Sequence, residues 1–140
     1  MKLRDADVLI VEDETFDVEL VLHALYVHAP DLKAAVATTG AAAIEYLQTH
    51  SPKAILLDLH LPDMDGCELL RRIREDFRCS GIPVIVLTGS SADRHRSEAH
   101  RLGISAYINK TPDVRALADH LTLFKQLLQA NHAPTGAGLR

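Results

Sequence analysis

The sequence predicts an α/β protein of the doubly wound type, in which helices cover both faces of a five-stranded parallel sheet. Five short apolar segments alternate with five segments of helical periodicity along the 140 residues, and this alternation is typical of parallel strands joined by crossover helices. Segments such as Ile55–Leu57 and Val84–Leu87 are apolar at every position, as strands buried on both faces require. The length fits one domain of ordinary size.

The predicted strands are short apolar runs bounded by charged or turn-forming residues. Pro83 stands at the start of the fourth, where a missing N–H group costs little. The strands are predicted at Val8–Val11, Ala34–Ala37, Ala54–Leu57, Val84–Leu87 and Ala106–Asn109.

The predicted helices carry apolar residues at helical spacing. In the first helix, Val18, Val21, Leu22 and Leu25 are expected to form the face that packs on the sheet. The five helices are predicted at Thr15–His28, Gly40–Thr49, Cys67–Asp76, Ala92–Leu102 and Pro112–Ala130.

Right-handed crossovers favour the open flavodoxin-like arrangement of these strands, with order 2-1-3-4-5. In such a sheet a ligand binds beyond the carboxyl ends of the strands, near strands 1 and 3. Taken singly, the polar residues at those ends could be a helix cap, a turn residue, a strand residue and a surface charge. Their convergence at one edge favours a shared site. These residues are Glu12, Asp13, Asp58, Thr88 and Lys110.

The three acidic residues of this set predict a cation site. Carboxylates of Glu12, Asp13 and Asp58 at one edge would repel one another unless a cation offset them. Oxygen ligands in a partly open site suit Mg²⁺, which combines one or two carboxylates with waters and a phosphate oxygen. Lys110 would then face the bound anion, and the Thr88 hydroxyl would donate a hydrogen bond to it. The site is therefore expected to bring a phosphoryl group to a carboxylate.

Composition argues against several other classes of protein. The net charge is −4, and residues 1–65 hold 12 acidic against 4 basic residues, which argues against a nucleic-acid partner. The apolar runs are too short to span a membrane. Cys67 and Cys79 fit no disulfide framework and no Cys-x-x-Cys motif, which favours a reducing, cytoplasmic location. We expect one domain over residues 1–130 and a flexible C-terminal tail over 131–140.

Four stretches of the sequence resemble the receiver domain of two-component response regulators. They are Val8–Glu14, Leu56–Gly66, Val84–Gly89 and Gly103–Lys110. The resemblance implies a single-domain receiver of the chemotaxis type, and the chemotaxis member is itself an established example of this strand order. A receiver would use almost the whole chain, so we expect no output domain within it and expect its output to be a protein contact.

The resemblance implies a signalling role, with no catalysis beyond the protein's own phosphoryl transfer and slow autodephosphorylation. Asp58 would take the phosphoryl group from a sensor histidine kinase or a histidine phosphotransfer domain. Mg²⁺ would be held by Glu12, Asp13, Asp58 and the backbone carbonyl of His60. His60 and Ser90 would flank the attacking water and tune the hydrolysis rate.

The resemblance also implies a switch. Lys110 and Thr88 would bind phosphoryl oxygens, and Tyr107 would turn inward as the Thr88 hydroxyl moves. This would change the surface around the fourth helix, the fifth strand and the fifth helix.

Two positions depart from the common receiver pattern. The acidic pair is Glu12-Asp13 where Asp-Asp is commoner, and Lys110 is followed by Thr111 where the family usually has a cis proline. A cis bond before a non-proline residue costs about 2.5–4 kcal/mol, so the Lys110–Thr111 bond is either trans or stabilised by the fold. The Lys-Thr pair and the missing output domain resemble the regulators that accompany bacterial phytochromes, which makes a bacteriophytochrome a candidate partner.

Two helices have more apolar surface than one buried face explains. On the first helix, Phe16, Leu20, His23 and Val27 form a stripe that would dock on the helical bundle of the kinase, the alternative being a broad core face with a staple at Phe16.

The fifth predicted helix has a second apolar ridge, which would form a homodimer or output face together with the fourth helix and fifth strand. The alternatives are that the tail covers the ridge or that it is simply tolerated. The ridge consists of Ala116, His120, Leu123 and Leu127.

Two other functions compete with this interpretation. A Mg²⁺-dependent phosphohydrolase would need a second aspartate where His60 stands, and a flavodoxin-like cofactor binder would need a glycine-rich loop where Glu12-Asp13-Glu14 stands. A receiver-like module that no longer accepts phosphate would lack Asp58, Thr88 or Lys110, and all three are present.

Overall fold

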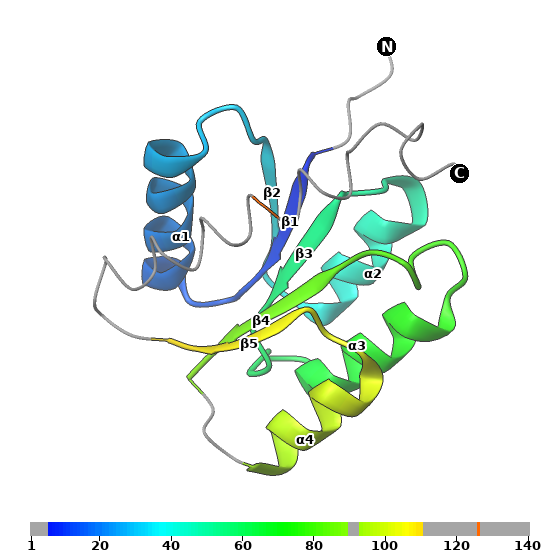
Figure 1. Ribbon diagram of the computed structural model, residues 1–140. Helices are drawn as coiled ribbons and strands as arrows, with labels where there is room; N and C mark the ends of the chain where they lie inside the picture. The colour runs from blue at the N-terminus through cyan, green and yellow to red at the C-terminus, as the bar shows by residue number, and fades with distance from the viewer. Residues whose placement is uncertain (1–5, 90–92, 111–125, 127–140) are drawn as a thin grey trace.

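Strands and helices alternate along the chain in the predicted order (Figure 1). The computed structural model describes residues 6–89, 93–110 and 126. Its elements are β1 (Val8–Val11), α1 (Thr15–His28), β2 (Ala34–Ala37), α2 (Gly40–Thr49), β3 (Ala54–Leu57), α3 (Gly66–Glu75), β4 (Val84–Thr88), α4 (Asp93–Leu102) and β5 (Ala106–Asn109).

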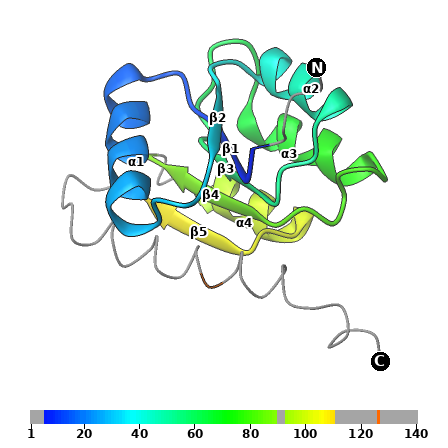
Figure 2. The ribbon, with the colours of Figure 1, turned by 90° about the horizontal axis from the view of Figure 1, so that it is seen from above.

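The five strands form one parallel sheet with the order β2-β1-β3-β4-β5, which confirms the predicted fold class. Helix α1 lies on one face of the sheet, and α2, α3 and α4 lie on the other (Figures 1 and 2). Val8 of β1 pairs with Ala34 of β2 and Ala54 of β3, so β1 is a central strand. The predicted fifth helix, apart from Gln126, and the predicted tail lie outside the described residues.

Within the described residues, three boundaries differ by one residue from the prediction: both ends of α3, which runs Gly66–Glu75, and the carboxyl end of β4. Helix α3 begins at Gly66 because the Asp65 carboxylate caps it, accepting the Cys67 N–H at 2.8 Å. Strand β4 continues to Thr88, which pairs with Asn109 of β5. Thr88 is thus held as part of the sheet and not in a following loop.

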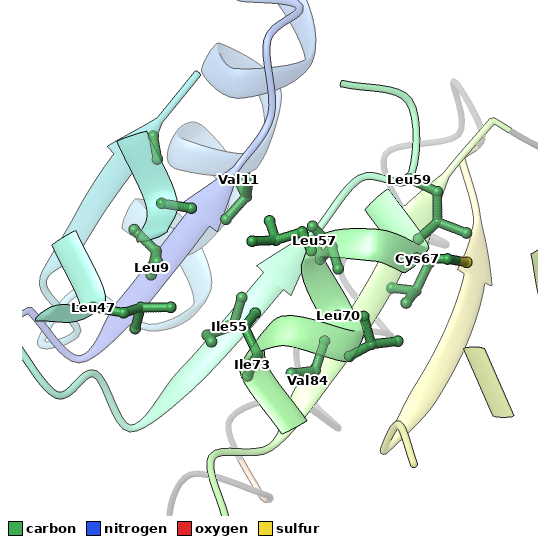
Figure 3. Close-up of a cluster of buried hydrophobic side chains, with 14 of the residues drawn as sticks. Leu9, Val11, Leu47, Ile55, Leu57, Leu59, Cys67, Leu70, Ile73 and Val84 are labelled. Atoms are coloured by element: carbon green, nitrogen blue, oxygen red, sulfur yellow. The ribbon is translucent and has the colours of Figure 1, made fainter. Parts of the chain in front are cut away.

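The larger part of the core lies between the sheet and α2, α3 and α4 (Figure 3). Strand side chains such as Leu9 and Ile55 meet helix side chains such as Leu70 and Ile73, and all four are buried. Burying each such side chain stabilises the fold by about 1.5–3 kcal/mol. The opposite face is built from Val8, Ile10 and other strand residues with Val21, Ala24 and Leu25 of α1.

The loop from β3 to α3 is attached to its surroundings at two places. The Asp63 carboxylate accepts hydrogen bonds from the N–H groups of Gly40 (2.8 Å) and Ala41 (2.9 Å), at the start of α2. These two bonds hold the pKa of Asp63 below its usual value. The Gly66 N–H donates to the Leu59 carbonyl at 2.9 Å. The segment that follows Asp58 is therefore connected both to α2 and back to the end of β3.

Both cysteines are buried free thiols. Burial raises the pKa of the Cys67 thiol to about 11, so it is protonated and unreactive at neutral pH. In the described part of the chain, no helix has the length and apolar character needed to cross a membrane.

Candidate functional site

The polar residues predicted at the strand ends meet at the carboxyl edge of the sheet. Glu12 and Asp13 follow β1, Asp58 follows β3, Thr88 ends β4 and Lys110 follows β5. Backbone hydrogen bonds extend the sheet into this edge, from the Asp58 N–H to the Val11 carbonyl (2.9 Å) and from the Lys110 N–H to the Thr88 carbonyl (2.8 Å). A hollow of about 470 Å³ opens above it, with Glu12, Asp13, Asp17, Asp58, His60 and Lys110 among its lining residues.

Two of the acidic side chains are buried. Glu12 is 4% and Asp58 is 5% exposed, whereas Asp13 is exposed. A buried carboxylate is costly unless it is hydrogen-bonded. One oxygen of each accepts a local backbone N–H at 3.1 Å, that of Glu14 for Glu12 and that of His60 for Asp58. The other oxygen of each faces Lys110.

Lys110 joins three carboxylates at the centre of the site. Its Nζ lies 2.7 Å from Glu12 Oε1, 2.7 Å from Asp17 Oδ2 and 3.0 Å from Asp58 Oδ2. An ammonium has three N–H donors, so these contacts can use all of them. Asp17, in the first turn of α1, was not predicted as a site residue. Its position in the sequence could have indicated this role, because Asp17 lies one helical turn after Asp13.

The surroundings shift the pKa values of the buried groups in different directions. Burial raises the pKa of Glu12 to about 7, although the hydrogen bonds from Lys110 and Glu14 oppose the shift. Burial also acts to raise the pKa of Asp58, but the His60 N–H, Lys110 and the Thr88 hydroxyl outweigh it and lower that pKa. For Lys110, the hydrogen bonds to Asp17, Glu12 and Asp58 outweigh burial and raise the pKa. Asp58 and Lys110 are therefore charged at neutral pH.

The site has the donor set that a hard cation prefers. Glu12, Asp13 and Asp58 each offer an oxygen, and these oxygens lie within 4.8 Å of one another. With Asp17 the site contains four carboxyl groups, three of which contact the single ammonium of Lys110, so negative charge is in excess. Mg²⁺ fits such a set of oxygens in an open site. The His60 backbone carbonyl as a further ligand stays a prediction.

Thr88 and Tyr107 lie on neighbouring strands. The Thr88 side chain is fully buried and hydrogen-bonds the Asp58 carboxylate. Tyr107 is half-buried on the sheet face that α4 covers. Its ring centroid lies 5.2 Å from the guanidinium carbon of Arg96 and 6.2 Å from the ring centroid of His100, both on α4. In this arrangement, Tyr107 is held against α4.

His60 stands at the rim of the site. Its side chain is exposed, and its ring meets that of His95 edge-on at a centroid distance of 5.9 Å. His95 in turn lies 3.6 Å from the Asp65 carboxylate. Ser90, the other residue predicted to tune hydrolysis, lies outside the described residues, as does the Lys110–Thr111 bond.

The apolar stripe predicted on α1 is only partly exposed. Phe16 is 67% exposed, and His23 and Val27 are exposed as well. Leu20, by contrast, is half-buried and packs against the core. The expectation that Leu22 lies in the core face is wrong, because it is 37% exposed. The ridge of the predicted fifth helix, Ala116, His120, Leu123 and Leu127, lies outside the described residues.

Comparison with known proteins identifies similar chains. Residues 8–122 match the family described as the response regulator receiver domain. Response regulator Rre1 of Synechocystis is 30% identical over 93% of this chain, which spans 54% of that protein. Response regulator Rcp1 of Synechocystis is 32% identical over 79% of this chain and 80% of its own length.

Solved structures give the same match. The phosphorylated cyanobacterial phytochrome response regulator RcpA superposes with a TM-score of 0.79 and 27% identity, covering 89% of this chain and 94% of its own. The Mn²⁺-bound form of Rcp1 superposes with a TM-score of 0.76 and 30% identity, covering 86% and 91%.

Proposed function

The chain belongs to the response regulator receiver domain family, whose members are signalling domains, and on that premise we propose that it is the phosphoacceptor of a two-component phosphorelay. Asp58 is the acceptor. The observation that carries this proposal is the buried Asp58 carboxylate, which lies 3.0 Å from Lys110 and hydrogen-bonds Thr88 beside two further acids.

Phosphoryl transfer to Asp58 is an in-line displacement. A carboxylate oxygen attacks phosphorus, the new O–P bond forms as the P–N bond to the donor histidine breaks, and the histidine leaves with the P–N electron pair. The lowered pKa keeps Asp58 ionised for this attack. Lys110 and Thr88 are placed to stabilise the phosphoryl oxygens where negative charge develops. Water attack on the acyl phosphate reverses the modification, and His60 and Ser90 tune its rate.

Glu12, Asp13, Asp58 and the His60 carbonyl would hold Mg²⁺ in the proposed site. Bound there, Mg²⁺ neutralises charge on the phosphoryl oxygens. The existence of a Mn²⁺-bound form of the relative Rcp1 supports a divalent cation at this edge. Glu12 also orients Lys110 before substrate enters, because it pairs with that ammonium, and Asp13 lines the open hollow.

Acetyl phosphate tests this function without a partner kinase. In the presence of Mg²⁺ the protein is expected to gain one phosphoryl group that is stable in acid and labile in base, as an acyl phosphate is. Intact-mass spectrometry measures the gain, and chelation of Mg²⁺ by EDTA is expected to suppress it. The absence of labelling with Mg²⁺, or equal labelling with EDTA, would overturn the proposal.

The proposed phosphodonor is a sensor histidine kinase or a histidine phosphotransfer domain. The similarity to Rcp1 and to the phytochrome regulator RcpA makes a bacteriophytochrome the first kinase to assay. Phe16, with its exposed neighbours on α1, would contact the helical bundle of the donor, and Leu20 would support that surface from below. Homodimerisation through α4, β5 and the predicted fifth helix remains part of the proposal, as does a cytoplasmic location, which the free thiols favour.

Arg96 provides a test of the proposed switch. If Tyr107 must leave α4 to turn inward, Arg96→Gln removes a cation–π contact worth about 0.5–1 kcal/mol and shifts the population toward the inward state. Mg²⁺-dependent affinity for beryllofluoride, followed by NMR amide shifts, is expected to rise about two- to fivefold. Arg101→Gln, on the same helix but paired with Glu98, is the control. Equal affinities in the Arg96 variant and the control would contradict this role of Tyr107.

A further inference from the structure

We propose that Asp17 is a positioning residue, which keeps the Lys110 ammonium at the phosphoryl site while Glu12 and Asp58 change partners. The inference rests on the proposed function and assigns a role to a residue outside the predicted set. Asp17 lies in the first turn of α1, and Lys110 follows β5, 93 residues later. Their contact of 2.7 Å therefore joins α1 to the carboxyl end of the edge strand β5.

Asp17 differs from the other two partners of Lys110 in its relation to the metal. Glu12 and Asp58 belong to the oxygen cluster that could hold a cation, and within the described residues that cluster does not include Asp17. When a cation and a phosphoryl group enter, the Glu12 and Asp58 oxygens are redirected to them. Asp17 has no such competing role, so its bond to Lys110 can persist throughout the reaction.

The anchor matters because a lysine side chain is long and flexible. Its ammonium sits on a four-carbon stem with many rotamers, and Lys110 is only half-buried. Once Glu12 and Asp58 are engaged elsewhere, the Asp17 carboxylate still fixes one N–H of the ammonium. The two remaining N–H groups are then free to bind phosphoryl oxygens. Productive transfer would thus depend on Asp17 through Lys110.

A simpler role for Asp17 is that of an acid in the first turn of a helix, where it stabilises the helix dipole. The two roles make different predictions when both residues are changed. A helix effect is independent of Lys110, so the effects of changing Asp17 and Lys110 would multiply. A positioning effect disappears once Lys110 has been removed.

A double-mutant cycle tests the inference. The rate of labelling by acetyl phosphate at saturating Mg²⁺ is measured for the parent, Asp17→Asn, Lys110→Met and the double variant. Asp17→Asn is expected to slow labelling about tenfold, within the range of coupling between contacting residues, and the double variant is expected to match Lys110→Met. Multiplicative effects would overturn the inference. A second cycle with Lys110→Ala, which also removes the ammonium, gives the same comparison if the methionine variant does not fold.

Two further variants complete the design. Asp17→Glu keeps the carboxylate and is expected to recover part of the rate. Glu19→Gln removes an exposed acid from the same helix and is expected to label like the parent. If the parent itself is not labelled, the proposed function fails. If the parent is labelled but the cycle is multiplicative, only the role of Asp17 fails.

Discussion

Replacing Asp58 with asparagine is expected to abolish labelling by acetyl phosphate completely. An amide has no ionised oxygen with which to form an acyl phosphate. The variant also lacks the negative charge that the Asp58 carboxylate contributes to the metal site. The shape is conserved, so the His60 N–H can still donate to the amide oxygen at the position of Oδ1. The loss would therefore be one of chemistry, with the fold retained.

Asp63→Asn is the matched control for this variant. Asp63 lies in the same loop, but its carboxylate caps α2 and does not face the hollow. We expect the Asp63→Asn variant to accept one phosphoryl group, as the parent does. Intact-mass spectrometry measures labelling of the Asp58 and Asp63 variants, and circular dichroism checks that both are folded. Persistent labelling of the Asp58 variant would mean that another side chain is the acceptor.

Gly66→Ala is expected to produce the largest loss of stability of any single methyl addition at the glycines discussed here. An added Cβ would lie 2.4 Å from Leu59 Cα and 2.9 Å from the Asp58 carbonyl oxygen. Both are backbone atoms, which cannot move aside as a flexible side chain can. Overpacking of this kind costs about 1–3 kcal/mol and sometimes more, and we expect the upper end, about 3 kcal/mol. Urea denaturation would show it as a lower transition midpoint.

Gly81→Ala is the control for this effect. An added Cβ at Gly81 has no heavy atom of another segment within 4 Å. The urea concentration at the transition midpoint is therefore expected to differ from that of the parent by no more than a few tenths of a molar unit. The Gly66 variant should also label more slowly, because the displaced atoms include the backbone of Asp58 itself. A Gly66 variant as stable as the Gly81 variant would show that the β3 end can shift without cost.

The sheet could be predicted from the sequence because its strands are buried on both faces. In β3 and β4 every position is buried. The apolar runs therefore identify these strands without any need to decide which alternate residues face the core. The site followed from the same rule, since the carboxyl ends of parallel strands share one edge. Glu12, Asp58, Thr88 and Lys110 meet there as predicted.

Helix α1 shows where periodicity fails. It carries apolar residues on nearly all sides, so spacing alone cannot decide which stripe faces the sheet. Leu22 was assigned to the core and is partly exposed, whereas Leu20 was assigned to the outer stripe and packs on the core. The Asp17–Lys110 pair escaped prediction for another reason. Its residues are 93 apart, and the contact depends on how α1 is set against β5.

The hydrogen bonds of the loop between β3 and α3 hold it to α2 on one side of Asp58. Asp63 ties the loop to α2, and Gly66 ties it back to Leu59. Thr88 and Tyr107 stand on the opposite side of Asp58, on β4 and β5. We therefore expect the structural change on phosphorylation to be asymmetric. Residues on the side of β4, β5 and α4 are expected to move, whereas α2 keeps its position relative to the sheet. The affinity of a partner that binds near α2 would then be the same before and after phosphorylation, whereas the affinity of a partner that binds at α4 would change.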